Sequence, residues 1–261
     1  MSNERVNESK KLRCIPVRYV GEEVISFAQN LEDVLMFRAL GGKRNGFYVD
    51  VGAGSPGWDS VTHWFSRIGW TGINIEPNPI LFCDIPSQRS RDINLNVGIH
   101  PTQGTMTFYQ VLQNEIGHGW GLSSFNPEAK EIAQRLGFTV NPIDVPVEPL
   151  TPILDEHAKR TIDFLKIDVE GLEREVILSC DFAKHRPRIL CIESIKPEHG
   201  IPNFENWEPI LVDSGYIFAA FDGINNYYVR REDDSLLSQF LAPVNVHDRH
   251  RKGAAGDLAI S

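Results

Sequence analysis

The sequence predicts an α/β protein built on a mostly parallel sheet of seven strands, with helices on both faces and an antiparallel hairpin closing the sheet. Three observations predict this fold class. Two strand–loop–helix units follow one another between residues 46 and 97, two more apolar strand and helix patterns occupy 162–180 and 189–215, and paired strand patterns lie at 216–221 and 227–229. Strands that alternate with helices form mainly parallel sheets with right-handed crossovers.

A leading helix is expected before the sheet. Ser26 is expected to cap its amino end, and Gly41-Gly42 to end it. Between them, four apolar residues recur with helical spacing: Phe27, Leu31, Val34 and Leu35.

The first tandem unit consists of a strand at 46–51, a tight glycine loop at 52–57 and a helix that contains Val61, Trp64, Phe65 and Ile68. The second unit has a strand at 71–76, a turn at 77–79, a short helix and a strand at 93–97. An extra strand is expected at 105–111. The irregular, glycine-rich segment Gly117–Ser124 is a candidate lid or substrate loop.

The second half of the chain returns to regular patterns. Thr151-Pro152 fits a helix N-cap followed by proline at the first helical position. A buried strand at 162–167 ends at Asp168, and an apolar strand at 189–192 ends at Glu193. The final pair of strands brackets residues 222–226 and is expected to form a β-hairpin.

Length and composition predict one large domain. The 261 residues are 41% hydrophobic and 23% charged, as in ordinary globular proteins. We expect this domain at residues 26–230, a polar leader at 1–25, and a C-terminal tail at 231–261 that packs in part on the domain. The four cysteines have no C-x-x-C spacing, which predicts buried free thiols: Cys14, Cys83, Cys180 and Cys191.

Charge and hydropathy exclude some partners. The net charge of -9 repels a phosphate backbone, so no nucleic acid is expected as a partner. No apolar run approaches the roughly 20 residues that a membrane span needs. The polar start of the chain lacks the apolar core of a secretory signal, so a cytoplasmic location is expected. The oligomeric state stays open.

Polar residues gather at the carboxyl ends of the predicted strands, where ligands of parallel sheets bind. These residues are Asp50, Glu76, Asn96, Asp168 and Glu193. Four of the five are acidic. Their position predicts a ligand site at this edge of the sheet.

The loop after the first strand favours one cofactor class. Gly52-x-Gly54-x-x-Gly57 fits the dinucleotide fingerprint, which alone is a weak signal. Asp50 precedes it and would repel the pyrophosphate of NAD but attract the ammonium and sulfonium groups of S-adenosylmethionine. We therefore expect the segment from Asp50 through Gly52, Ala53 and Gly54 to hold the methionine part of S-adenosylmethionine. The alternative role of Asp50 is a turn cap.

Two further strand ends fit a nucleoside. Glu76 lies about where the ribose-binding acid of nucleotide folds is found, so a bidentate contact with two ribose hydroxyls is expected. A solvated strand end is the alternative for Glu76. For Asn96, an adenine contact and a plain turn residue are nearly even alternatives.

Five stretches of the chain, collinear from Ser26 to about Val229, resemble FkbM-type methyltransferases. They are SFAQNLED at 26–33, GFYVDVGAG at 46–54, GWTGINIEP at 69–77, DFLKIDVEG at 163–171 and FDGIN at 221–225. The resemblance implies a Rossmann-like class I methyltransferase fold. It also implies O-methylation, commonly of a sugar hydroxyl in polysaccharide, glycan or natural-product assembly, and adds Gln29 to the expected cofactor contacts.

The acceptor side is expected at Asp168, Glu170 and Glu193. A carboxylate acting as base, or a divalent cation such as Mg²⁺ held by Asp168 and Glu193, would each activate an acceptor hydroxyl. Asp168 is also expected near the cofactor. The alternative for Glu170 is a first-turn helix acid. His118 and His199 are further candidate bases, for which an ordinary loop histidine is the alternative.

Two other functions compete with methyl transfer. An NAD-dependent Rossmann oxidoreductase is disfavoured by Asp50 and by the lack of a Tyr-x-x-x-Lys pair in the middle of the chain. A catalytically inactive cofactor-binding scaffold would be expected to lack the acceptor-side acids. Those acids are present, so a small-molecule or glycan acceptor is the expected partner.

Overall fold

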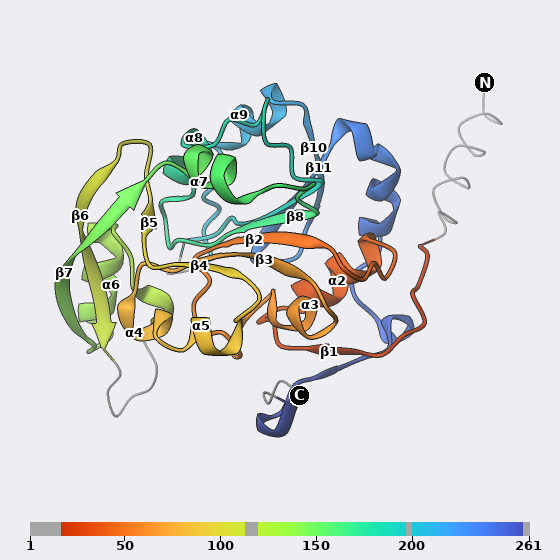
Figure 1. Ribbon diagram of the computed structural model, residues 1–261, viewed down its shortest axis with the longest axis horizontal. Helices are drawn as coiled ribbons and strands as arrows, with labels where there is room; N and C mark the ends of the chain where they lie inside the picture. Colours follow the sequence, from red (N-terminus) through yellow and green to blue (C-terminus); the bar gives the residue numbers. More distant parts are fainter. Residues whose placement is uncertain (1–16, 113–119, 197–199, 258–261) are drawn as a thin grey trace.

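The computed structural model describes residues 17–112, 120–196 and 200–257, and its centre is a seven-stranded sheet (Figure 1). The strand order is β10-β11-β9-β8-β2-β3-β4. In chain order the strands are β2 (Phe47–Val51), β3 (Thr71–Ile75), β4 (Ile93–Leu95), β8 (Phe164–Ile167), β9 (Ile189–Glu193), β10 (Tyr216–Phe221) and β11 (Asn225–Arg230). The mixed α/β architecture expected from the sequence is confirmed.

The sheet is mixed. Strands β4, β3, β2, β8 and β9 pair in parallel, whereas β11 is antiparallel to both β9 and β10. Strands β10 and β11 form the predicted terminal hairpin, with Tyr216 opposite Arg230. The carboxyl ends of the five parallel strands therefore meet at one edge of the sheet.

One face of the sheet is covered by α7 (Leu150–His157), α8 (Glu173–Leu178) and α9 (Glu208–Asp213), as Figure 1 shows. Alternate strand residues such as Val49, Val51 and Leu165 pack there against Leu154 and Ile177. Burial of these apolar side chains is the main stabilising contribution on this face.

The opposite face is covered by α2 (Glu32–Ala39) and α3 (His63–Arg67). Tyr48 and Phe164 point to this side and stack with ring centroids 5.8 Å apart. The 3₁₀ segment η2 (Arg231–Phe240) also packs here and buries Phe240. Because side chains alternate along a strand, residues 48 and 50 share this face, while 47, 49 and 51 share the other.

A second, three-stranded sheet lies beside the first (Figure 1). Its order is β5-β7-β6, from β5 (Gly98–Ile99), β6 (Gly104–Leu112) and β7 (Thr139–Glu148), with α6 (Pro127–Arg135) packed on it. Strand β6 confirms the expected extra strand, but β7 was not predicted. Pro142 and Pro146 lie inside β7, and prolines normally argue against a strand.

The leading helix begins later than predicted. Ser26 ends a short strand, β1 (Val24–Ser26), and α2 begins at Glu32, after Leu31 at a positive φ of 66°. The hydroxyl of Ser26 donates to Asp33 Oδ1 at 2.7 Å instead of capping the helix. The predicted stop is confirmed, since α2 ends before Gly41.

Smaller differences concern helix and strand ends. Helix α7 begins at Leu150 with Pro149 as its N-cap, so Thr151 is not the cap. The Thr151 hydroxyl instead donates to the carbonyl of Ser179 at 2.9 Å and accepts from the amide of Asp181 at 2.7 Å. Strand β4 stops at Leu95. The remaining short elements are α4 (Pro79–Phe82), α5 (Ile85–Gln88) and η1 (Trp120–Leu122).

The cysteines only partly follow the prediction. Cys180 and Cys191 are buried free thiols, as expected, but Cys83 is exposed. Cys83 follows α4, whose residues are not buried, so no core covers its sulfur. Cys14 lies outside the described residues.

The C-terminal segment returns to the start of the chain. After η2 come η3 (Val246–Asp248), β12 (His250–Lys252) and η4 (Ala255–Asp257). Strand β12 pairs in parallel with β1. Arg38, which is 2% exposed, donates through Nη1 to both carboxylate oxygens of Asp248 at 3.1 and 2.8 Å, which fixes this segment against α2.

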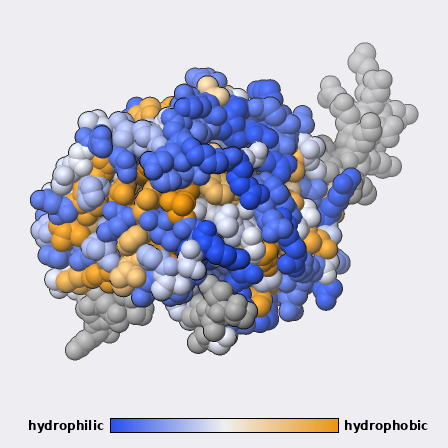
Figure 2. Space-filling view, in the orientation of Figure 1, coloured by the Kyte–Doolittle hydropathy of each residue, from blue (hydrophilic) through white to orange (hydrophobic). Residues whose placement is uncertain are grey.

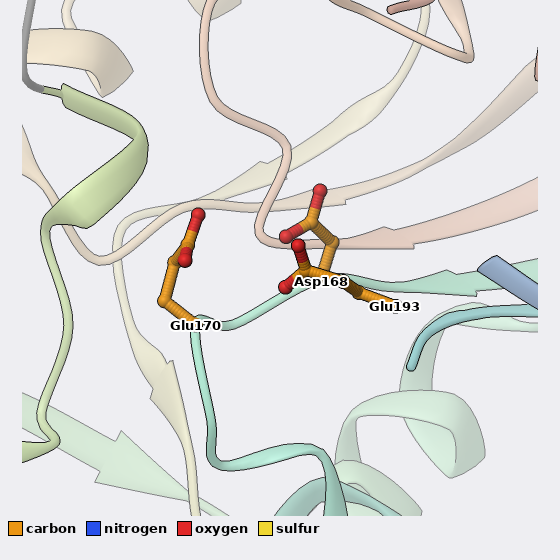
Figure 3. Close-up of side chains that lie close together, drawn as sticks. All are labelled: Asp168, Glu170 and Glu193. Atoms are coloured by element: carbon orange, nitrogen blue, oxygen red, sulfur yellow. The ribbon is translucent and has the colours of Figure 1, made fainter. Parts of the chain in front are cut away.

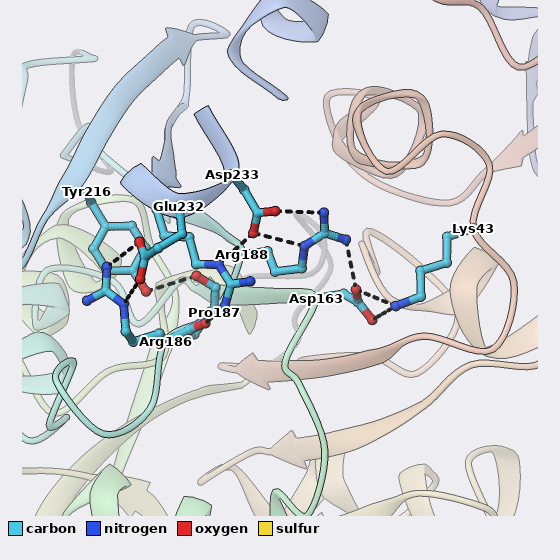
Figure 4. Close-up of polar contacts among 9 residues, drawn as sticks. Lys43, Asp163, Arg186, Pro187, Arg188, Tyr216, Glu232 and Asp233 are labelled. Atoms are coloured by element: carbon cyan, nitrogen blue, oxygen red, sulfur yellow. Dashed lines mark hydrogen bonds and ion pairs between the residues drawn. The ribbon is translucent and has the colours of Figure 1, made fainter. Parts of the chain in front are cut away.

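An ion-pair network joins the amino ends of the central strands, away from the carboxyl ends (Figure 4). Asp163, which is fully buried, accepts two bonds from Lys43 Nζ at 2.6 and 2.7 Å and one from the Phe47 amide at 3.0 Å. Arg188 bridges Asp163 and Asp233. The network aligns β2, β8 and β9 at their starts.

The surface in view is mostly hydrophilic, with hydrophobic residues interspersed mainly at the end where β6 and β7 lie (Figure 2). None of the helices within the described ranges combines the length and apolar character that crossing a bilayer requires.

Candidate functional site

A cavity of about 740 Å³ opens at the carboxyl ends of β2, β3, β8 and β9. This is the edge of the sheet at which the sequence predicted a ligand site, and the volume is in the range of small-molecule sites. The lining residues used below are Gln29, Gly52, Ala53, Gly54, Trp58, Asp59, Glu76, Leu81, Val97, Ile99, Phe108, Ser124, Phe125, Lys166, Asp168, Glu170 and Glu193.

The glycine loop forms the floor of the cavity. Gly52 and Gly54 have positive φ values of 78° and 59°, which L side chains rarely adopt. A Cβ atom on Gly54 would have no neighbour within 4 Å in the described part of the chain. The loop amides of Gly52 and Ala53 donate to the Ile75 carbonyl at 3.0 and 3.1 Å. Residues 52–54 therefore line the cavity with a backbone that hydrogen bonds hold in place.

Glu76 is held at the end of β3 by two backbone amides. Its Oε2 accepts from the Gly54 amide and its Oε1 from the Asn78 amide, both at 2.7 Å. The residue is 4% exposed, and burial raises the pKa of its carboxyl to about 7 against the lowering effect of these amides. Each oxygen keeps a free lone pair that can accept a ligand hydroxyl.

Asp50 lies elsewhere than the sequence analysis expected. It is 1% exposed, does not line the cavity and points to the α3 side of the sheet, where it accepts from the Thr62 hydroxyl at 2.8 Å. Its other oxygen lies 3.5 Å from Lys166 Nζ. Lys166, the register partner of Asp50 on β8, does line the cavity, so Asp50 contacts the site through Lys166 and not directly.

Lys166 links both sides of the site. Its Nζ donates to the Gly52 carbonyl at 2.8 Å and lies 3.2 Å from Asp168 Oδ2. Burial lowers the pKa of Lys166, but Asp168 and Asp50 outweigh burial and raise the pKa above its usual range. The ammonium therefore stays charged beneath the glycine loop.

One end of the cavity is apolar. Leu81, Val97, Ile99, Phe108 and Phe125 line it, and the two phenylalanine rings form an edge contact with centroids 4.9 Å apart. Asn96, for which an adenine contact and a turn residue were the predicted alternatives, does not line the cavity. Its Nδ2 donates to the carbonyls of Glu76 and Pro77 at 2.8 and 3.2 Å, so it acts as a turn residue.

The other end is acidic. Carboxyl oxygens of Asp168, Glu170 and Glu193 lie within 4.8 Å of one another; Asp168 and Glu170 follow β8, and Glu193 is the last residue of β9 (Figure 3). Burial, together with Asp168, raises the pKa of both Glu170 and Glu193 well above the usual range. Glu193 Oε2 is buried and has no hydrogen-bond partner among the residues that the structure describes.

The turn after β8 is held in an unusual conformation. Glu170 and Gly171 both have positive φ, 55° and 98°. Glu173 Oε1 accepts from the Val169 and Gly171 amides at 3.3 and 3.0 Å, and the Ser124 hydroxyl contacts the Glu170 carbonyl at 3.1 Å. Glu170 precedes α8 rather than lying in its first turn. The positive φ of Glu170 strains the backbone, and backbone strain of this kind is typical of functional sites.

Gln29 and Trp58 form part of the cavity wall. Gln29 lies on the loop between β1 and α2. Trp58, which is 51% exposed, lies on the loop that follows Gly54. The loop that follows Gly54 is fixed at Pro56, whose carbonyl accepts from Arg89 at 2.6 Å and contacts His63 Nδ1 at 2.7 Å.

Several residues of the site were not predicted from the sequence: Trp58, Asp59, Phe108, Phe125, Lys166 and Glu173. Ser124, which also lines the cavity, belongs to the segment Gly117–Ser124 that was predicted as a lid or substrate loop. Lys166 could have been identified from the sequence, because a lysine between apolar residues of a buried strand needs a charged partner. The others belong to irregular segments or to the second sheet, whose pairing is not local. His118 and His199 lie outside the described residues.

The family model for the methyltransferase FkbM domain matches residues 50–218. The match covers more than half of the chain. The chain therefore belongs to the FkbM methyltransferase family, as the resemblance predicted. Membership indicates a methyltransferase, and such families generally use S-adenosylmethionine.

A solved structure of methyltransferase FkbM from Methylobacillus flagellatus KT aligns with the chain at a TM-score of 0.45 and 17% sequence identity. The alignment covers 79% of this chain and 48% of that chain, so this chain spans about half the length of that protein. The search among curated proteins found no match.

Proposed function

We propose that the chain is an S-adenosylmethionine-dependent O-methyltransferase acting in the cytoplasm on a sugar hydroxyl in polysaccharide, glycan or natural-product biosynthesis. The observation that carries the cofactor assignment is the charge of the cavity. Five residues that line it carry carboxyl groups, Asp59, Glu76, Asp168, Glu170 and Glu193, against one lysine. A cation beside a buried carboxyl group favours its ionised form, so this lining can pair with the sulfonium and ammonium of the cofactor, whereas it offers a pyrophosphate a single ammonium.

The residues present fit the cofactor from end to end. The backbone of Gly52–Gly54 suits the methionine part, and the two free lone pairs of Glu76 suit the ribose hydroxyls. The apolar end formed by Val97, Ile99 and Phe108 suits an adenine ring. These assignments replace the direct contacts expected of Asp50 and Asn96. When bound, the cofactor supplies a methyl group on a positively charged sulfur.

The acidic end of the cavity would receive the acceptor. A carboxylate at Asp168, Glu170 or Glu193 would accept the proton of the acceptor hydroxyl as the new O–C bond forms and the S–C bond breaks. The main gain would come from holding the hydroxyl in line with the methyl group, because proximity and orientation lower the barrier of such a transfer. Lys166 would keep Asp168 in place.

A divalent cation held by Asp168 and Glu193 is the alternative to a carboxylate base for activating the acceptor hydroxyl. Two observations support it: the carboxyl oxygens lie close together, and the buried Glu193 Oε2 has no hydrogen-bond partner within the described ranges. Hard cations such as Mg²⁺ prefer carboxylate oxygens and would acidify the bound hydroxyl.

Trp58 supports a sugar as acceptor. Its indole is half exposed although it lines the cavity. An exposed aromatic face at a cavity wall can pack against the apolar C–H face of a pyranose ring, while carboxylates bind the hydroxyls at its edge.

Calorimetric titration with S-adenosylmethionine, S-adenosylhomocysteine and NAD tests the cofactor assignment. We expect micromolar-range binding of the first two and no heat with NAD. Binding of NAD alone would establish the oxidoreductase alternative instead. Methyl transfer to a panel of sugars, followed by mass spectrometry, separates an enzyme from an inactive scaffold.

A further inference from the structure

The loop that carries Gln29 into the cavity lies outside residues 50–218, the range of the family match. It runs from the end of β1 to the start of α2. The strand before it has three residues, and Leu31 at its far end has a positive φ of 66°. So short a segment with a strained end needs restraints from elsewhere to hold one conformation.

Those restraints come from the C-terminal segment. Strand β12 pairs with β1 in parallel register, with Ser26 opposite Lys252. The Val24 amide donates to the Arg249 carbonyl at 2.9 Å, and the Gly253 amide donates to the Ser26 carbonyl at 2.7 Å. The pairing continues to the residue directly before the loop.

Lys252 reaches past the strand to the loop itself. Its Nζ donates to the carbonyls of Ala28 and Gln29 at 2.6 and 3.1 Å. Asp33, at the start of α2, also binds this loop: its Oδ2 accepts from the amides of Phe27 and Ala28 at 2.8 and 3.3 Å. The loop backbone is thus held at two carbonyls by the Lys252 ammonium and at two amides by the Asp33 carboxylate. This sets the direction in which the Gln29 side chain leaves the backbone.

The C-terminal segment is itself anchored. The Arg38–Asp248 ion pair is buried on both sides, and Arg38 also donates to the Gln239 carbonyl at 2.9 Å. Close packing adds a second anchor, because a Cβ atom on Gly253 would lie 2.5 Å from the Phe27 ring. The ring of Phe27 in turn makes an edge contact with His63, with centroids 4.2 Å apart.

We infer that the C-terminal strand β12 completes the cofactor site, with Lys252 as a positioning residue that acts through Gln29. This inference rests on the proposed use of S-adenosylmethionine. The inference gives a binding role to β12, which lies outside the family match in sequence. Two hydrogen bonds from the Lys252 ammonium join β12 to the loop that carries Gln29.

The test measures S-adenosylhomocysteine binding by calorimetry in the full chain. Lys252→Met should weaken binding about three- to tenfold, the loss expected for hydrogen bonds of this kind. Gln29→Ala should weaken binding similarly, and the double variant should be no weaker than the stronger single one. Lys252→Arg, which can still donate to both carbonyls, should restore affinity. Arg251→Met is the matched control, since Arg251 pairs with Asp257 instead.

Three outcomes would overturn the inference. They are wild-type affinity in Lys252→Met, additive losses in the double variant, and equal losses in Lys252→Met and Lys252→Arg. Circular dichroism and urea unfolding check that each variant is folded, and Gly253→Ala, which pushes on Phe27, gives a second perturbation expected to weaken binding. A wild-type chain that does not bind the ligand would refute the proposed function and this inference together. Binding by all variants alike would refute the inference alone.

Discussion

The carbonyl oxygen of Asp168 lies 1.8 Å from the position that a Cβ atom on Gly52 would occupy. The loops after β2 and β8 are therefore in backbone contact, and only glycine fits at 52. Lys166 strengthens the same junction by donating to the Gly52 carbonyl while lying 3.2 Å from the Asp168 carboxylate. The cofactor side and the acceptor side of the cavity are thus built as one unit.

Replacing Gly52 by alanine should damage both stability and cofactor binding. The added methyl group must displace the Asp168 carbonyl, and the positive φ adds backbone strain. We expect the free energy of unfolding to fall by roughly 2–5 kcal/mol, the sum of overpacking and left-handed strain. Urea unfolding measures it. Gly54→Ala is the control: φ is also positive but the space is open, so a loss of only about 1–2 kcal/mol is expected. Equal losses in both variants would contradict the contact.

Replacing Glu76 by alanine should weaken cofactor binding while the fold is retained. The substitution removes the carboxylate, so the ribose hydroxyls and the Gly54 amide would both lose their hydrogen-bond acceptor. Hydrogen bonds to charged groups contribute about 1.5–3 kcal/mol, which predicts a dissociation constant roughly 10- to 150-fold higher. Calorimetry measures the change. Glu76→Gln, which keeps one carbonyl oxygen, should lie between alanine and wild type, and an unchanged constant in Glu76→Ala would remove Glu76 from the site.

The central sheet and much of the site could be predicted because their signals are local. Each parallel strand is a short apolar run that ends in a polar residue, and such ends gather at one edge. The placement of Glu76 and Asp168 at the cavity follows from this pattern. The position of Asp50 does not follow from this pattern, because its side chain is buried against Thr62 and Lys166 instead of lining the cavity.

The rest could not be predicted because its contacts are distant in sequence. Val24 pairs with His250, and each of the two strands has only three residues. Strand β7 contains two prolines and is stabilised by pairing with β6 on one side and β5 on the other. No local pattern reveals which segment lies opposite another when the turn between them is long.

Stability should fall as pH rises through the range in which Glu32 loses its proton. Burial raises the pKa of Glu32 from 4.5 to about 7, so between these values the folded chain keeps a proton that the unfolded chain has released. Folding is therefore favoured at low pH and loses up to about 3 kcal/mol towards pH 7, at about 1.4 kcal/mol per pKa unit.

Urea unfolding of wild type and Glu32→Gln between pH 5 and pH 8 checks this dependence. The glutamine variant cannot ionise, so its free energy of unfolding should change less with pH than that of wild type. Glu131→Gln, at an exposed position, removes the same formal charge and should keep the wild-type slope. Parallel curves for wild type and Glu32→Gln would show that Glu32 does not titrate in this range.

Replacing Asp168 by asparagine should separate binding from turnover. Asparagine retains the size of the side chain and can still accept from Lys166, so cofactor affinity should stay within a few-fold of wild type. Turnover should fall by about 10² to 10⁴, the range for lost acid–base assistance. Calorimetry and a methyl-transfer assay on the true acceptor measure the two quantities. Asp84→Asn, at an exposed position, is the control and should keep both.

A chelator then distinguishes the two roles open to Asp168. If Asp168 and Glu193 hold a divalent cation, wild-type activity should disappear with the chelator and return with Mg²⁺ or Mn²⁺. If Asp168 is a simple base, activity should be indifferent to the chelator. We expect the metal-dependent result, because a hard cation would relieve the repulsion among the three carboxyl groups that lie within 4.8 Å of one another. Full turnover by Asp168→Asn would refute both roles.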